Sequence, residues 1–152
     1  MQEIESLLLK IIEDTLRDFP DIFLVEFLVR GKEERYVIDV FLDGDNGIDV
    51  EKCAKISRRI ARILEEKDLF PNAYILNVSS PGVSKPLRFP RQYAQHIGRD
   101  VVVTLVREGA NREVSGKLIE ATTNYITLQP LKTEAISFQF HEVAFSKVKL
   151  PW

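Results

Sequence analysis

A short apolar run that ends in a proline-glycine turn divides this chain into two parts with different hydrophobic patterns. Residues 74–78 are apolar and lie between turn-forming residues, which predicts a β-strand. Pro81 presets φ for the second position of a turn and Gly82 accepts the positive φ of the third, so residues 80–83 predict a type II turn. Prolines and cations alternate in the next segment. We therefore expect a stiff basic hinge at residues 85–90.

Before the turn, helical and strand-like periods alternate along the chain. Apolar residues recur at helical spacing from Ile4 to Phe19, and Pro20 ends that helix. Residues 22–29 and 36–42 are rich in β-forming residues and predict two strands of a hairpin. A second helix is expected from Val50 to about Lys67, with Asp49 as its N-cap.

These elements, together with the strand at residues 74–78, predict an N-terminal α-β-β-α-β layer domain over residues 1–84. Both of its helices can cover one face of the sheet. We therefore expect an α+β fold for the chain, with a second domain of different hydrophobic pattern after the hinge.

After the hinge, the chain changes to short β-rich segments. Pro90 begins and Gly98 ends a short helix near residues 91–96. Five short strands are then expected, at residues 101–106, 113–121, 125–129, 135–140 and 145–150. They predict a small barrel or sandwich over residues 91–152. The single turn at residues 141–143 before the last strand is similar to that of SH3-like and Sm-like β-barrels.

Cysteine and histidine are too few for several kinds of site. With one cysteine and two histidines, an internal disulfide and a Cys/His metal site are excluded. Cys53 falls on the apolar half of the second helix, which favours a core residue over a reactive thiol. The first residues lack the basic start of a secretion signal, and no apolar run reaches the length of a membrane span. We expect a cytoplasmic monomer without metal, cofactor or membrane contact.

Paired carboxylates and the loop after them invite functional interpretations. Asp39 and Asp43 bracket Phe41 on one face of the second strand, but no third ligand or nucleophile is near in sequence. We expect them at a solvated edge. Residues 43–47 lack the glycine and glutamate positions of a calcium loop. As a G-x-x-G clamp for RNA they would set Asp45 against the phosphates, so a turn before the helix is the expected structure.

The remaining candidate catalytic residues do not form a recognisable constellation. Ser79 and Ser80 stand in S-S-P-G, which is neither a nucleophile elbow nor a phosphate loop. His96 and His141 lie far apart and are expected at the surface or as cap residues. We therefore expect that the protein is not an enzyme.

Cations gather at two places, and each could bind nucleic acid. On the second helix they lie within about a third of the helical wheel. That stripe suits either a solvated face or a phosphate-binding ridge. In the hinge they recur every three residues, the period of a polyproline helix, so they could project to one side. The cations are Lys52, Lys55, Arg58, Arg59 and Arg62 on the helix, and Lys85, Arg88 and Arg91 at the hinge.

The V-S-S-P-G run, followed by a basic residue and Pro-Leu, resembles the hallmark of the RimP family of ribosome maturation factors. The departures are Asn77 and Ser84, where the family has acidic residues, Val83, where it has Leu, and Lys85, where it has Arg. Val83 and Lys85 keep size or charge, whereas Asn77 and Ser84 each remove a negative charge. The residues of this chain that the resemblance assigns to the family's signature motif are Ser79, Ser80, Pro81, Gly82, Lys85 and Pro86.

The resemblance implies a function for the chain. Family members bind the free small ribosomal subunit during its late maturation without catalysing a reaction, and their partners are ribosomal RNA and a ribosomal protein near the decoding centre. The signature itself could serve only to set the backbone geometry of a turn. Two alternatives stay open: a scaffold that binds only proteins, and a general RNA-binding module unrelated to ribosome assembly. Which domain contacts RNA also stays open.

Overall fold

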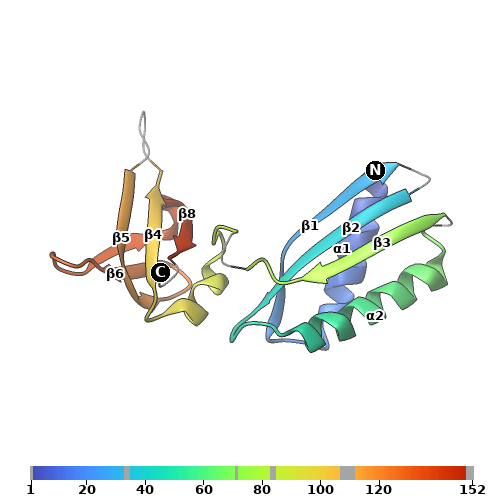
Figure 1. Cartoon of the computed structure of the whole chain (residues 1–152), viewed down its shortest axis with the longest axis horizontal. Coiled ribbons are helices and arrows are strands. Elements are labelled where there is room, and N and C mark those ends of the chain that lie inside the picture. Colours follow the sequence, from blue (N-terminus) through green and yellow to red (C-terminus); the bar gives the residue numbers. More distant parts are fainter. Residues whose placement is uncertain (1, 33–34, 71, 83–84, 107–111, 150–152) are drawn as a thin grey trace. The chain divides into compact units, whose positions relative to one another are not determined.

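The computed structural model describes residues 2–32, 35–70, 72–82, 85–106 and 112–149 (Figure 1). The fold is α+β, as predicted: helices and strands in the N-terminal part are followed by a strand-rich sheet. The chain divides into two compact units, the N-terminal unit Met1–Pro81 and the C-terminal unit Gly82–Trp152. This division falls a few residues before the predicted hinge.

The N-terminal unit has the predicted order of elements. It consists of α1 (Gln2–Leu16), β1 (Ile22–Lys32), β2 (Arg35–Gly44), α2 (Val50–Lys67) and β3 (Ala73–Ser79). β1 and β2 form an antiparallel hairpin, and β3 pairs with β2 in parallel. The sheet order β1-β2-β3 therefore puts β2 in the centre and leaves β3 as an edge strand.

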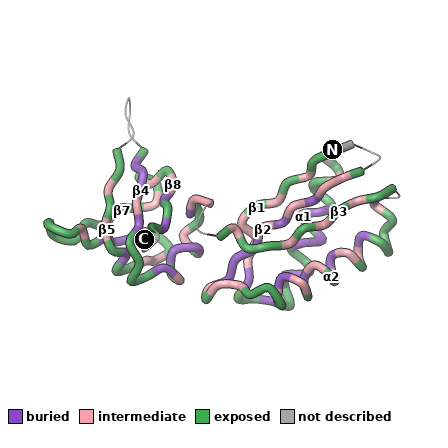
Figure 2. The backbone as a smooth tube through the Cα atoms, viewed as in Figure 1, coloured by how far each residue is buried: buried purple, intermediate pink, exposed green. Residues whose placement is uncertain are grey.

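One face of this sheet packs against both helices. Ile38, Val40 and Leu42 alternate along β2, and all three are fully buried. They share a core with Leu8 of α1 and Ile60 of α2, and burying each such side chain contributes about 1.5 to 3 kcal/mol. Figure 2 shows how buried residues recur among intermediate and exposed ones along the elements of the unit.

Both ends of α2 are set by local chemistry. The Asp49 carboxylate accepts a hydrogen bond from the Lys52 backbone N–H at 2.8 Å, which confirms the predicted N-cap. The loop before it is the predicted turn, because the Gly47 N–H donates to the Gly44 carbonyl at 3.0 Å. At the other end Asp68 adopts a left-handed conformation and its N–H donates to the Glu65 carbonyl at 3.2 Å. Val50, on the apolar half of the wheel, is nonetheless 84% exposed, because the wheel gives a side chain's direction but not whether another element reaches it.

The C-terminal unit is one antiparallel sheet with short 3-10 turns at its start and before its last strand. The expected short helix is realised as two 3-10 turns, and the last strand begins two residues earlier than predicted. The sheet order is β7-β6-β5-β4-β8. The elements are η1 (Pro90–Gln92), η2 (Ala94–His96), β4 (Asp100–Leu105), β5 (Arg112–Ala121), β6 (Tyr125–Gln129), β7 (Ile136–Gln139), η3 (Phe140–Glu142) and β8 (Val143–Val148).

Part of the predicted hinge belongs to the core of this unit. Leu87 is only 5% exposed and exchanges two backbone hydrogen bonds with Ser146 of β8, at 2.6 and 3.0 Å. The fully buried Tyr93 donates from its hydroxyl to the Ser146 Oγ at 2.7 Å. Residues from Leu87 onward are therefore packed on the C-terminal sheet and are not a free connection.

Two expectations for side chains of the C-terminal unit are wrong. His96 is buried, with 9% exposure, because its 3-10 turn packs beside β5, whereas the sequence predicts a surface or cap position. The alternation of Ile136, Phe138 and Phe140 in the sequence predicts that all three point inward, but Ile136 is 36% exposed, whereas Phe138 on the same strand β7 is buried. His141 is exposed on η3, as expected.

Candidate nucleic-acid interface

The three hinge cations do not share one extended conformation. Lys85 is half-buried, whereas Arg88 and Arg91 are exposed. The backbone N–H groups of Arg88 and Phe89 both donate to the Oε1 of the buried Gln92, each at 2.9 Å. Arg91 lies on η1 itself. Two of the three cations are thus held by a defined turn, and a continuous polyproline row is not what places them.

The cationic stripe on α2 divides into two groups. Three of its members contact the segment between α1 and β1. The Arg59 guanidinium lies 2.6 Å from a carboxylate oxygen of Asp18. The Lys52 ammonium lies 3.9 Å from a carboxylate oxygen of Asp21. Lys55 and Arg59 also lie over the Phe19 ring, 5.7 and 5.5 Å from its centroid. Such exposed pairs contribute at most about 1 kcal/mol, but they neutralise part of the stripe.

The other two members, Arg58 and Arg62, are exposed. Neither makes an ion pair with any residue that the structure describes. The positive charges of Arg58 and Arg62 are therefore available to a phosphate group that approaches α2, whereas the charge of Arg59 is already neutralised by Asp18.

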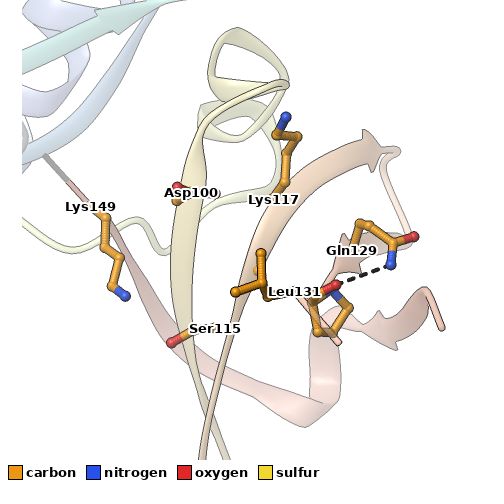
Figure 3. Close-up of a pocket in the computed structure, with 8 residues that line it drawn as sticks. Asp100, Ser115, Lys117, Gln129, Leu131 and Lys149 are labelled. Atoms are coloured by element: carbon orange, nitrogen blue, oxygen red, sulfur yellow. Dashed lines mark hydrogen bonds between the residues drawn. The ribbon is translucent and has the colours of Figure 1, made fainter. Parts of the chain in front are cut away.

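A third cationic surface lies on the outer face of strands β8, β4 and β5. Lys117 stands opposite Asp100 in the β4–β5 ladder, and Lys147 stands opposite Val102 in the β4–β8 ladder. The backbone N–H of Lys149 donates to the Asp100 carbonyl at 2.8 Å. Figure 3 shows Lys149 and Lys117 on either side of Asp100. No ion pair to these lysines is formed within the described ranges.

Two adjoining hollows shape this lysine surface. The first has a volume of about 440 Å³ and extends from Lys149 to Lys117 and the exposed Leu131 (Figure 3). The second, of about 290 Å³, is lined by Phe145 and Lys147 and shares Lys149 with the first. Asp100 and Glu113 are the acidic residues that line them.

The lysine surface was not predicted from the sequence. Lys117 is 30 residues from Lys147 in the chain, and only the β5-β4-β8 order brings their strands together. The one local signal was Lys147 and Lys149, two residues apart and therefore on the same side of an extended chain.

The two units carry opposite net charge. Residues 1–81 contain 11 Lys or Arg against 17 Asp or Glu, for a net charge of −6. Residues 82–152 contain 10 Lys or Arg against 6 Asp or Glu, for a net charge of +4. A polyanion is therefore attracted by the C-terminal unit and repelled by the N-terminal unit.

The carboxylates of β2 are structural and do not lie at an edge. Asp39 lies on the central strand, where one carboxylate oxygen accepts from the Arg30 Nε at 3.0 Å and the other from the Asn77 Nδ2 at 2.9 Å. Asp43 is 7% exposed and accepts from the Gly44 N–H at 2.8 Å. The expectation of a solvated edge was wrong because strand order is not visible in the sequence.

Other groups that could bind a metal ion or act as a nucleophile are few in the described part of the chain. No group of three or more His, Cys, Asp or Glu side chains there is placed to hold a metal ion. Cys53 is buried, as predicted, and burial raises the pKa of its thiol, with the Asp49 charge adding to the rise. The thiol is therefore protonated at neutral pH and is a poor nucleophile.

The signature residues lie at the end of β3 and just beyond it. Ser79 is the last residue of β3, and Ser80 and Pro81 lead to Gly82, whose φ is +68°. This positive φ is the one predicted for the third position of the turn. Val83 and Ser84 lie outside the described residues, so the type II turn as a whole stays a prediction. Lys85 and Pro86 begin the segment that leads to Leu87.

Comparison with known proteins bears on the same region. A family model described as the RimP N-terminal domain matches residues 11–84. The chain is also 42% identical over 88 residues to a curated protein of Cytophaga hutchinsonii named ribosome maturation factor RimP. The resemblance to the RimP family is confirmed. The aligned part is 57% of this chain and 53% of the relative, so the chain spans about half the length of the curated relative that it matches.

The RimP match covers the end of α1, then β1, β2, α2 and β3, and ends at residue 84, before the signature residues Lys85 and Pro86. It therefore includes Asn77 and Ser84, the two positions that depart from the family's acidic residues. The lysine surface and the whole of the predicted hinge, residues 85–90, lie after residue 84, beyond the RimP N-terminal domain match. Among the described helices, none is long and apolar enough to cross a membrane.

Proposed function

We propose that this protein is a non-catalytic assembly factor that binds the free small ribosomal subunit and promotes its late maturation. The observation that carries the proposal is the match of residues 11–84 to the RimP N-terminal domain. It is supported by the 42% identical relative, whose name is ribosome maturation factor RimP. The relevant partners are ribosomal RNA and a ribosomal protein near the decoding centre, as the family resemblance implies.

The charge distribution supports a contact with ribosomal RNA through the C-terminal unit and the hinge. That unit has a net charge of +4, and Arg88 and Arg91 are exposed on it. On α2, Arg58 and Arg62 are the better candidates, because Lys55 and Arg59 already contact Phe19 and Asp18. Each phosphate contact made by such a cation releases counterions, so binding should weaken with salt.

The proposal has a structural part as well. We propose that the chain forms two independently folded domains and that strands β4–β8 make an SH3-like barrel. The order β7-β6-β5-β4-β8 and the 3-10 turn η3 before the last strand support that assignment. A monomer in the cytoplasm suits a factor that meets the ribosomal subunit during its assembly.

Sedimentation of purified protein with purified ribosomal subunits through a sucrose gradient tests the function. Co-migration with free small subunits and not with large subunits or assembled ribosomes is expected. Equal binding to both subunits and to unrelated RNA would favour the general RNA-binding module. Failure to bind any of them, together with co-migration with another protein complex when cell extract is run on the same gradient, would favour the protein-only scaffold.

A further inference from the structure

A groove in the N-terminal unit runs between α2 and the free edge of β3. Its volume is about 510 Å³. On the helix side its walls are Val50, Cys53, Ala54 and Ser57, which recur at the spacing of one helix face. On the strand side its wall is the continuous run of residues 76–80, which ends in the two signature serines.

The strand side of the groove is made by the backbone edge of β3. Side chains of a strand alternate between the two faces of the sheet, so consecutive residues can line one groove only where the strand's edge faces it. The sheet order β1-β2-β3 leaves that edge without a neighbouring strand. Backbone hydrogen bonds of residues 73–79 to other described residues are confined to the ladder with β2. The edge therefore presents N–H and C=O groups that a further strand can pair with.

The chemistry of the groove favours an extended polypeptide. A strand that pairs with an edge gains main-chain hydrogen bonds and directs alternate side chains into neighbouring pockets. Here the small side chains of Ala54 and Ser57 leave room, while Leu76 and Val78 provide apolar contacts. Val50, 84% exposed at the end of the groove, gives one more apolar contact that nothing in the described part of the unit covers.

Charge decides which kind of chain fits. The N-terminal unit has a net charge of −6, and the one charged side chain among the described residues that line the groove is Asp49. The neutralised cations of α2 contact Asp18, Phe19 and Asp21, none of which lines the groove. Among its described lining residues the groove offers a carboxylate and no cation, which favours a segment rich in Lys and Arg over a nucleic acid.

We propose that an extended, basic segment of a ribosomal protein binds in this groove as a fourth strand beside β3. The inference rests on the proposed function and assigns a division of labour within it. The groove of the N-terminal unit holds protein, and the cations of the C-terminal unit, with Arg58 and Arg62 of α2, hold RNA. The signature serines, Ser79 and Ser80, then lie where the added strand meets the end of β3.

Photo-crosslinking from the groove tests this directly. The full chain carries p-benzoylphenylalanine at Val50 and is mixed with purified free small subunits. We expect a crosslink to a ribosomal protein that maps to a Lys- and Arg-rich segment. The same label at Glu66, exposed elsewhere on α2, is the matched control and should not give that product. A groove label that crosslinks only to ribosomal RNA, or to nothing while the protein co-sediments with the subunit, overturns the proposal.

Two variants test the groove without a label. Ala54→Trp fills it, and Val50→Arg adds a cation at an exposed position that cannot disturb the core. Each should weaken binding to purified small subunits about tenfold or more, as loss of a buried anchor does, while Glu66→Trp binds like the wild type. Unchanged binding of both variants contradicts the groove site. If the wild type itself does not bind the small subunit, the proposed function fails and the groove proposal fails with it.

Hydrogen exchange in the complex gives a third readout. Pairing along the free edge of β3 should slow amide exchange at alternate residues of the strand, because only every second N–H points to that edge. Protection confined to other segments, in a complex that has formed, would contradict strand addition.

Discussion

The Asn77 amide donates a 2.9 Å hydrogen bond to the Asp39 carboxylate, across the pairing of β3 with the central strand β2. The two residues stand directly opposite each other in the ladder. Arg30 on β1 binds the other oxygen of the same carboxylate. A polar row thus crosses all three strands on the face away from the helices. The RimP pattern has an acidic residue at position 77, so this chain replaces a charge by a hydrogen-bond donor.

Replacing that amide by a carboxylate should destabilise the N-terminal unit. Asn77→Asp removes the donor and sets two like charges opposite each other, at a cost of about 0.5 to 1 kcal/mol at neutral pH. The penalty should fade as pH falls toward the ordinary aspartate pKa of about 3.9, because one carboxyl then takes up a proton. Urea unfolding at neutral and acidic pH measures it. Asn77→Ser, without a new charge, is the control, and an equal loss in both variants at neutral pH would show that repulsion plays no part.

The hydrogen bond between Tyr93 and Ser146 should stabilise the C-terminal unit. Tyr93→Phe leaves the buried Ser146 hydroxyl without this partner and should lower the free energy of unfolding by about 1 to 2 kcal/mol. Urea unfolding of the two proteins at neutral pH measures the difference. Loss of less than a few tenths of a kcal/mol would contradict the assignment.

The effect of the same variant on stability should depend on pH in the alkaline range. Burial raises the pKa of the Tyr93 phenol, and the hydrogen bond to Ser146 opposes part of that rise. A phenol whose pKa is higher in the folded state stabilises the fold fully below its unfolded pKa of about 10, and this contribution is lost as pH rises through the folded pKa. The stability difference between wild type and Tyr93→Phe should therefore narrow above about pH 10. Both proteins keep the other tyrosines, so their titration cancels in the comparison.

Gly82 is constrained by its backbone and not by space. Its φ is +68°, and, its chain neighbours aside, a Cβ built there meets no described atom within 4 Å. Gly82→Val should therefore cost about 1 to 3 kcal/mol from backbone strain alone. Gly82→Asn should cost less, because asparagine tolerates left-handed conformations. Thermal melts of both variants test this, and equal melting temperatures for valine, asparagine and glycine would show that the position is not under this constraint.

Leu87 should decide how short a C-terminal fragment can be. A fragment of residues 91–152, the domain expected from the sequence, lacks the buried Leu87 and its two hydrogen bonds to Ser146. We expect residues 82–152 to unfold cooperatively and residues 91–152 to be less stable by about 2 kcal/mol or more, as after removal of a buried leucine. Equal melting curves would mean that Leu87 is not part of this core. Failure of both fragments to fold would contradict two independent domains.

What could be predicted from the sequence was local, and what could not depended on pairing between distant segments. The bounds of α2 and its Asp49 cap follow from one helical period and one side chain, and both are confirmed. The positive φ of Gly82 follows from the proline-glycine pair. Asp39 was placed at an edge because the sequence does not reveal that β2 is central.

The binding surfaces show the same division. The cations of α2 were recognised as one stripe, but which of them Asp18 and Phe19 occupy depends on how α1 packs. Lys117 and Lys147 come together only through the order of β5, β4 and β8. The groove beside β3 combines a helix face with a strand edge and has no signal in the local sequence.

The salt dependence of binding to purified free small subunits tests the central claim most directly. Lys85, Arg88 and Arg91 are changed together to glutamine, and the matched control changes Lys10, Arg17 and Lys67, three cations of the N-terminal unit outside every proposed surface. The hinge variant should bind more weakly than the wild type, with a slope against log salt that is smaller by about 2 to 3, whereas the control should bind like the wild type. Wild-type affinity and slope in the hinge variant, or an equal loss in the control, would contradict an RNA contact at the hinge.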